Sequence, residues 1–327
     1  MQHVIDARGL AKTYKIRARG KGSPRTLEAV KGVDLTVSAG EIVGFLGPNG
    51  AGKTTTLRML TTLLDPTGGS ATVAGADLTT NPVEVRRRIG YVAQMGTTDA
   101  SALAGEELVD HARMYRIDRQ TAEQRGRMLL RVLDLDGVWE RKCGSLSGGQ
   151  RRRLDIAMGL IHEPTLVFLD EPSTGLDPQS RANLWEHIRR VRDEFNTTVF
   201  ITTHYMDEAD ALCDRILIID HGEIVARGTP DELKRRVGGD AIYLTLVDLS
   251  RIAEANAVIA ERLAGSTPEV HGAEIHLTAP DGGSALPGLL VALSKAGIDT
   301  AAVAVRRPTL DDVFLTLTGR SLRESNG

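Results

Sequence analysis

Short, uninterrupted apolar runs are the clearest feature of the hydrophobic pattern. They lie at Val43–Leu46, Leu166–Leu169, Thr198–Ile201 and Ile216–Ile219. Consecutive rather than alternating apolar residues are typical of strands that are buried on both faces, as in a parallel sheet. We therefore expect these four runs to be buried strands.

Helical apolar spacing occurs between these runs. Leucines recur every three or four positions in Thr54–Leu64, and further helical stretches lie at Ser180–Phe195 and Met206–Cys213. This alternation of strand and helix predicts an α/β fold. Residues from about 97 to 162 are rich in leucine and methionine and poor in β-branched residues, which indicates an inserted helical subdomain.

The pattern changes again after Gly228-Thr229-Pro230. Two helical segments then alternate with three strand-like segments, and a last helix follows Pro308, where Thr309 can cap it with Asp312. We predict two domains: residues 3–235, and a small α+β C-terminal domain at 240–322. The expected C-terminal strands are 242–247, 274–277 and 301–305, and the expected helices are 252–263 and 289–295.

Composition narrows the class of protein. The 327 residues include 40 basic and 43 acidic ones, so the net charge of −3 gives no global positive field for nucleic acid. We expect the arginine triplets 86–88 and 151–153 to be solvated or subunit-contact faces. Cys143 and Cys213 lie outside any zinc or disulfide pattern, and we expect buried thiols. No apolar run approaches 18 residues, so we expect no membrane span.

A glycine-rich motif follows the first buried strand and precedes a helix. It fits G-x-x-x-x-G-K-[ST], in which backbone N–H groups and the helix N-terminus bind phosphate. Lys53 would reach the β and γ phosphates, and the Thr54 hydroxyl could ligate Mg²⁺. An ordinary glycine-rich turn is the alternative interpretation. The motif consists of Gly47, Pro48, Asn49, Gly50, Ala51, Gly52, Lys53 and Thr54.

Two carboxylates, Asp170 and Glu171, end the buried run Leu166–Leu169. An acid at such a position needs a nearby cation, and a nucleotide-bound Mg²⁺ would supply one, so Asp170 is the expected metal ligand. Glu171 is placed to polarise an attacking water. A pair of acids at a solvated strand end is the alternative.

A second anion site is predicted at Ser147-Gly148-Gly149-Gln150, where a serine and two glycines begin an amphipathic helix. One chain has no second triphosphate to occupy it. With this motif the sequence resembles the nucleotide-binding subunits of ATP-binding cassette (ABC) transporters. The remaining family motifs follow in the family's order: Gln94 after strand 89–93, Ser173–Asp177, and His204 after the strand ending at Thr203.

The resemblance implies a P-loop NTPase fold and roles for further residues. Gln94 would ligate Mg²⁺ and water, His204 would contact the γ-phosphate, and Asp177 would communicate across a dimer. Tyr14 would stack on adenine, and Thr55 would join the ATP-binding loop. Read singly, Tyr14 could be any surface tyrosine, Gln94 a polar strand end and His204 a chance neighbour of a strand. Family members form dimers that enclose two ATP, so Ser147–Gln150 would bind the partner's ATP.

Two further segments, His204–Ala209 and Arg307–Gly319, resemble the daunorubicin/doxorubicin-resistance type of ABC ATPase. This implies a Mg²⁺-dependent ATPase that powers efflux of a drug, antibiotic or other hydrophobic compound through a separate permease. The chain would be a homodimer, peripheral on the cytoplasmic face of the cell membrane, with no nucleic acid partner. The alternatives are an importer, a lipid or polysaccharide exporter, a soluble non-transport ABC ATPase or a nucleotide sensor.

Two departures from the family pattern stand out. Residues Lys15–Leu27 form a longer and more basic insertion than expected, which we interpret as a surface loop. The segment Met95–Ser101 after Gln94 is polar, and Ala104 replaces a threonine common in relatives. Because this region would face the permease, the sequence leaves the partner and substrate open.

Overall fold

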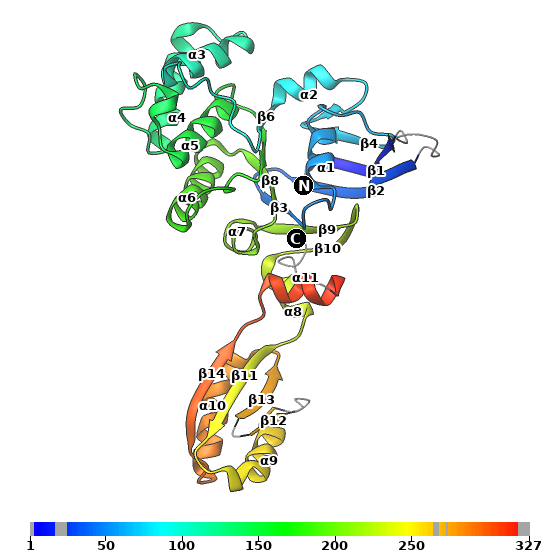
Figure 1. Cartoon of the computed structure of the whole chain (residues 1–327), viewed down its shortest axis with the longest axis vertical. Coiled ribbons are helices and arrows are strands. Elements are labelled where there is room, and N and C mark those ends of the chain that lie inside the picture. The colour runs from blue at the N-terminus through cyan, green and yellow to red at the C-terminus, as the bar shows by residue number, and fades with distance from the viewer. Residues whose placement is uncertain (1–2, 17–24, 264–267, 273, 320–327) are drawn as a thin grey trace. The chain divides into compact units, whose positions relative to one another are not determined.

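The computed structural model describes residues 3–16, 25–263, 268–272 and 274–319. Its contacts divide the chain into two compact units, one containing the described residues up to Pro230 and the other those from Asp231 onward. Figure 1 shows the helices and strands of both units. The domain limits 3–235 and 240–322 stay a prediction. Among the described residues, no helix combines the length and apolarity needed to cross a membrane.

The centre of the first unit is a six-stranded sheet of order β10-β9-β3-β8-β7-β6. All neighbours are parallel except β10, which pairs antiparallel with β9 at the edge. Strands β3, β7 and β8 are buried along their whole length, which confirms the expectation of strands covered on both faces and the α/β class. The strands are β3 (Ile42–Leu46), β6 (Ile89–Val92), β7 (Leu166–Asp170), β8 (Thr198–Thr203), β9 (Arg215–Asp220) and β10 (Glu223–Gly228).

A second, antiparallel sheet of order β2-β1-β4-β5 was not predicted from the sequence. Helix α1 (Lys53–Leu60) contributes Leu57 and Leu60 to a core shared with Ile5 of this sheet and Phe45 of the parallel sheet. In β2 the first four residues are exposed, so its apolar alternation is visible only in its second half. The strands are β1 (His3–Ile16), β2 (Arg25–Ser38), β4 (Gly68–Val73) and β5 (Ala76–Asp77).

Two expectations for this region were wrong. Helix α1 ends four residues before Leu64, because Thr62 adopts a left-handed conformation with φ of 60°. The insertion Lys15–Leu27 is not wholly a loop, since its two ends belong to the paired strands β1 and β2. The part at 17–24 lies outside the described residues.

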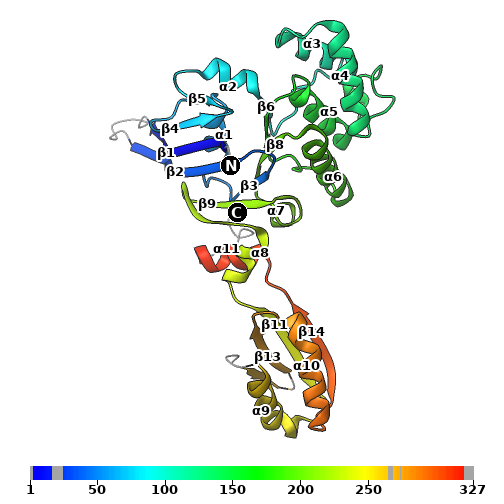
Figure 2. The ribbon, with the colours of Figure 1, turned by 180° about the vertical axis from the view of Figure 1, so that it is seen from behind.

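The helical subdomain packs beyond the β6 edge of the parallel sheet, as both views show (Figures 1 and 2). Its last helix touches β6 so closely that a Cβ on Gly90 would lie 2.1 Å from the Gly159 carbonyl oxygen. Glycine is therefore required where helix and strand meet. The helices of the first unit not yet named are α2 (Pro82–Arg88), α3 (Ala104–Met114), α4 (Arg119–Val132), α5 (Gly148–Leu160), α6 (Pro178–Phe195) and α7 (Met206–Leu212).

The second unit has an antiparallel sheet of order β12-β13-β11-β14, with α9 and α10 contributing to its core. The expected β-α-β-α-β order lacked β12, a strand of three exposed residues without apolar alternation. Thr309 and Asp312 form the expected cap of the last helix, in which Leu310, Val313 and Phe314 are buried and Leu317 is exposed. The elements are α8 (Pro230–Arg236), β11 (Asp240–Leu246), α9 (Ile252–Arg262), β12 (Glu269–His271), β13 (Glu274–Ala279), α10 (Gly282–Lys295), β14 (Thr300–Arg306) and α11 (Leu310–Thr318).

Candidate active site

Four neighbouring strands carry the predicted site residues to one edge of the sheet. In the order β3-β8-β7-β6, their carboxyl ends lead to the glycine loop, His204, Asp170-Glu171 and Gln94. Ligands of open α/β sheets bind at this edge, outside the carboxyl ends of the strands. The topology therefore brings together segments that lie up to about 160 residues apart in the sequence.

The glycine loop is shaped by close packing against its surroundings. A Cβ on Gly47 would lie 2.2 Å from the Ile219 carbonyl oxygen, and one on Gly52 would lie 2.7 Å from that of Ala29. Gly52 also has a φ of 107°, which favours glycine. Helix α1 begins directly after it at Lys53, and no side chain caps that helix. Its first backbone N–H groups can therefore bind an anion.

Lys53 is buried inside this loop. Its Nζ donates to the carbonyl oxygens of Gly47 at 2.7 Å and Pro48 at 3.1 Å, and it lies 3.4 Å from Glu171 Oε1. Burial lowers the pKa of Lys53, while the charges of Glu171 and Asp170 oppose that change. The loop thus holds a cation where the phosphates of a nucleotide would lie.

Glu171 is the point at which the other site residues meet. Its Oε2 accepts from Gln94 Nε2 at 3.1 Å and Thr174 Oγ1 at 3.3 Å, and lies 3.1 Å from His204 Nδ1. Burial raises the pKa of Glu171, but His204 and Lys53 together outweigh it, so the net pKa is lowered. The carboxylate is therefore held ionised and able to accept a proton.

The backbone of Glu171 is unusual. Its φ is 42°, and its N–H donates to the Thr202 carbonyl oxygen on the adjacent strand at 3.1 Å. A left-handed conformation at a non-glycine residue is uncommon and persists where its surroundings fix it. The turn directs the Glu171 side chain toward Lys53 rather than along β7.

Asp170 is buried beside this cluster. Its Oδ1 accepts from Thr202 Oγ1 at 2.6 Å, and burial raises the pKa of Asp170 despite that bond. Among the described residues there is no group of three or more His, Cys, Asp or Glu side chains suited to a metal. The oxygen donors of Thr54, Asp170 and Gln94 suit instead a hard ion such as Mg²⁺, which keeps few protein ligands and bonds mainly to phosphate and water.

The signature segment, Ser147–Gln150, forms the start of helix α5. Ser147 caps α5: its Oγ accepts from the Gln150 N–H, and Gln150 Oε1 accepts from the Ser147 N–H. A Cβ on Gly149 would meet only Ser180 within 4 Å, so the approach to the backbone is open. Asp177 caps α6 through Ser180, next to this segment. These residues are not part of the cluster around Glu171.

Tyr14 belongs to the strand pair beside the glycine loop. It pairs with Leu27 of β2, two residues before Ala29, whose carbonyl oxygen packs on Gly52. Lys12 Nζ lies 5.6 Å from the centre of the tyrosine ring. Adenine stacking by Tyr14 stays a prediction.

Arg152 is a site residue that the sequence analysis missed. The triplet 86–88 is exposed as expected, but Arg152 is only 6% exposed, so the expectation of a solvated or contact face at 151–153 was wrong for it. Its guanidinium donates to the carbonyl oxygens of Ala93, Asp170 and Pro172 at 2.6, 3.0 and 2.9 Å. A run of three arginines gives no signal of which one is buried.

Asp155, one turn further along α5, gives a pH-dependent prediction. It is buried against Thr97, whose N–H bonds to it, and burial raises its pKa from 3.8 to about 6. The folded chain holds this proton more tightly than the unfolded chain, so the free energy of unfolding falls as the pH rises from about 4 to 6. We expect the wild-type protein to lose up to about 3 kcal/mol of unfolding free energy over this pH range, and Asp155→Asn not to show this loss.

Urea unfolding at pH 4 and pH 7.5 measures this effect. The stability of Asp155→Asn relative to wild type should rise with pH, whereas Asp110→Asn, an exposed position on α3, should show no such change. An equal difference at both pH values for Asp155→Asn would contradict the prediction.

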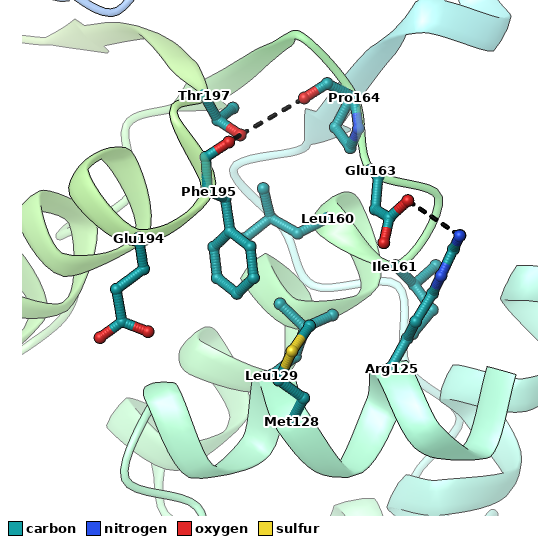
Figure 3. A pocket seen from close by; sticks show the side chains of 10 residues that line it. All are labelled: Arg125, Met128, Leu129, Leu160, Ile161, Glu163, Pro164, Glu194, Phe195 and Thr197. Carbon is teal, nitrogen blue, oxygen red and sulfur yellow. Dashed lines mark hydrogen bonds and ion pairs between the residues drawn. The ribbon is translucent and has the colours of Figure 1, made fainter. Parts of the chain in front are cut away.

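A separate cavity of about 300 Å³ lies at the opposite edge of the sheet (Figure 3). Thr197 and Pro164, which line it, precede β8 and β7, so it opens at their amino ends. Its wall combines apolar side chains such as Met128 and Phe195 with the ion pair of Arg125 and Glu163 at 2.8 Å. None of the predicted site residues lines it, and we assign the active site to the carboxyl edge instead.

Comparison with known proteins gives two family matches. Residues 30–174 match the ABC transporter family, and residues 228–318 match the C-terminal domain of DrrA1-3-like ATP-binding proteins. The daunorubicin resistance ATP-binding protein DrrA2 of Streptomyces coeruleorubidus is 42% identical, covering 94% of this chain and 95% of its own. The Nod factor export ATP-binding protein I of Burkholderia lata is 36% identical, covering 90% of this chain and 93% of its own.

Solved structures also resemble the chain. An ATP-binding cassette in a dimeric post-hydrolysis state, bound to ADP and Pi, is 26% identical with a TM-score of 0.60. The match covers 69% of this chain and 98% of that one. The glycine loop, the Glu171 cluster and the signature segment all lie within the first unit, which is the size of that cassette.

Proposed function

The chain belongs to the ATP-binding proteins of ABC transporters, in the group with a DrrA-like C-terminal domain, and from this we propose that it drives drug or antibiotic efflux through a separate permease. It is an ABC-type ATPase. The observation that carries the hydrolytic role is the convergence of Lys53, Gln94 and His204 on one ionised carboxylate, Glu171, while the similarity to a daunorubicin resistance protein supports the efflux role.

The chain's residues divide the work of hydrolysis. Lys53 and the backbone of the glycine loop bind the β and γ phosphates, because an ammonium and N–H groups stabilise the charge of the transferring group. Glu171 accepts the proton of the attacking water as the water oxygen bonds to the γ-phosphorus, while the bond from that phosphorus to the β–γ bridging oxygen breaks and ADP leaves. Gln94 and His204, each about 3.1 Å from the Glu171 carboxylate, orient that water and the γ-phosphate.

Magnesium fits the same edge. Thr54, Asp170 and Gln94 would hold it with their hydroxyl, carboxylate and amide oxygens. Bound there with ATP, it supplies positive charge that offsets the charge on the phosphates.

A second copy of the chain is part of the proposal. The open backbone around Gly148 and Gly149 is a surface that can bind an anion, and this surface is separate from the glycine loop. In a head-to-tail homodimer it would contact ATP bound by the partner, and Asp177 beside it would contact the partner as well. The dimeric cassette with ADP and Pi supports this arrangement.

The relatives support a proposal for the class of transported compound. The 42% identical relative is named for daunorubicin resistance, and the linearmycin resistance ATP-binding protein LnrL of Bacillus subtilis is 37% identical over 90% of this chain. A hydrophobic drug or antibiotic is therefore the proposed substrate. The chain would act at the cytoplasmic face of the membrane, bound to its permease. Export of a lipid or polysaccharide is the second candidate, favoured by the Nod factor export relative.

Two measurements test the transport role. Affinity purification of the chain from detergent-solubilised membranes should recover a multi-spanning membrane protein, the proposed permease. Cells that express both proteins should then accumulate less daunorubicin, measured by its fluorescence, than cells in which the chain carries Glu171→Gln. Recovery of the permease without a change in daunorubicin would support another substrate, whereas failure to recover any permease would contradict the transporter proposal.

A further inference from the structure

We propose that Arg152 is a positioning residue that fixes Gln94 and Glu171 relative to each other and to helix α5, which begins with the signature segment. This inference rests on the proposed roles of Gln94 and Glu171 in hydrolysis. It adds a residue outside every motif used above, and it gives the signature segment a physical connection to the hydrolytic centre of its own chain.

The three hydrogen bonds of Arg152 reach both catalytic segments. Nη1 donates to Ala93, the residue before Gln94, while Nη2 and Nε donate to Asp170 and Pro172, the residues on either side of Glu171. All three acceptors are backbone carbonyl oxygens, so the guanidinium fixes the peptide chain from which each side chain projects. Gln94 and Glu171 then meet at 3.1 Å. Their separation thus depends on one planar group with rigid donor geometry.

Helix α5 holds the Gln94 segment at a second point. Asp155 bonds to the Thr97 N–H, three residues after Gln94, and a Cβ on Gly96 would lie only 2.8 Å from Asp155 Oδ2. Gln94 therefore lies between two attachments to the same helix, one from Arg152 and one from Asp155. Movement of α5 carries both ends of this segment with it.

Helix α5 connects the signature segment to Arg152, and this connection would affect ATP turnover. Ser147 caps the 13-residue helix α5, and Arg152 lies within that helix, five residues after Ser147, so the helix connects the two. Occupation of the signature segment by a partner's ATP would therefore set the position of Arg152, and through it the distance between Gln94 and Glu171. A misplacement of about 1 Å in a catalytic group can lower a rate on the order of 100-fold.

The alternative role for Arg152 is structural, because a buried guanidinium that donates to three carbonyl oxygens also stabilises the fold. A matched control separates the two. Arg215 likewise donates to a distant backbone carbonyl, that of Thr36 at 2.6 Å, and pairs with Glu41. It lies at the amino end of β9, the edge of the sheet opposite to Gln94 and Glu171. Arg215→Gln should therefore lower the melting temperature without a selective loss of turnover.

The experiment compares Arg152→Gln, Arg152→Lys and Arg215→Gln with wild type in kcat and KM for ATP, in binding of a fluorescent ATP analogue, and in melting temperature. We expect Arg152→Gln to lower kcat by roughly 10- to 100-fold with KM and analogue affinity within about threefold. Arg152→Lys keeps the positive charge but has fewer hydrogen-bond donors. Its kcat should be several-fold higher than that of Arg152→Gln. If Arg152→Gln does not fold, the lysine variant alone carries the comparison.

Three outcomes would overturn the inference. The first is a kcat of Arg152→Gln equal to that of wild type, and the second is an equal loss of kcat and of melting temperature in Arg152→Gln and Arg215→Gln. The third is a higher KM for ATP in Arg152→Gln with kcat unchanged. Glu171→Gln in the same assay separates this inference from the proposed function. If Glu171→Gln abolishes turnover while Arg152→Gln does not affect it, the inference alone fails. If Glu171→Gln hydrolyses ATP normally, the assignment of the base fails.

Discussion

Glu171→Gln is expected to lower kcat for ATP hydrolysis by about 10²- to 10⁴-fold, the range for loss of a general base. Glutamine keeps the shape of the side chain and can still contact Gln94 and His204, but its amide cannot accept the proton of the attacking water. Removal of one negative charge beside Lys53 also leaves more positive potential for the phosphates. ATP should therefore still bind, and dimers with trapped ATP should accumulate.

Turnover, ATP binding and size-exclusion chromatography with and without ATP check this result. Glu163→Gln is the control, because Glu163 is an exposed carboxylate at the opposite edge of the sheet, paired with Arg125. Its kcat should equal that of wild type. Unchanged turnover in Glu171→Gln, together with the absence of an ATP-dependent dimer, would show that another group acts as the base.

Lys53→Ala is expected to weaken ATP binding by roughly 10- to 100-fold, the loss that follows from removing a charge-assisted hydrogen bond to phosphate. The glycine loop would keep its backbone N–H groups but lose the buried cation that Lys53 supplies. Glu171 would lose a neighbouring positive charge. Turnover should fall with binding. This pattern differs from Glu171→Gln, in which binding persists.

Isothermal titration with ATP measures the effect of Lys53→Ala. Lys31→Ala is a matched control, since Lys31 is an exposed lysine of β2 that pairs with Glu223 at 3.2 Å. It should bind ATP as wild type does. Equal ATP affinity in Lys53→Ala and wild type would mean that the glycine loop binds phosphate without its lysine, contrary to the role we assign to it.

The parallel sheet and its carboxyl edge could be predicted because they depend on local pattern. Strands buried on both faces are uninterrupted apolar runs, and the glycine loop must lie between such a strand and a helix. These two signals locate Lys53, Thr54, Asp170 and Glu171 without any knowledge of tertiary structure. The order of the strands then brings Gln94 and His204 to the same edge.

Other features could not be predicted because they depend on contacts between distant segments. The burial of Arg152 is set by carbonyl groups 18 to 59 residues away, and nothing in the triplet 151–153 distinguishes it. The left-handed backbone of Glu171 depends on Thr202 of the adjacent strand. The end of α1 was misjudged because Leu63 and Leu64 continue the helical spacing after Thr62 has already left the helix.

The separation of the signature segment from the Glu171 cluster has a genetic consequence. In the proposed dimer each ATP would be enclosed by the glycine loop of one chain and the Ser147–Gln150 segment of the other. A mixed dimer of one normal copy and one copy with a defective glycine loop would therefore lose one site and keep the other complete. If transport requires both sites, an allele with such a defect would impair the product of the wild-type allele in the same cell.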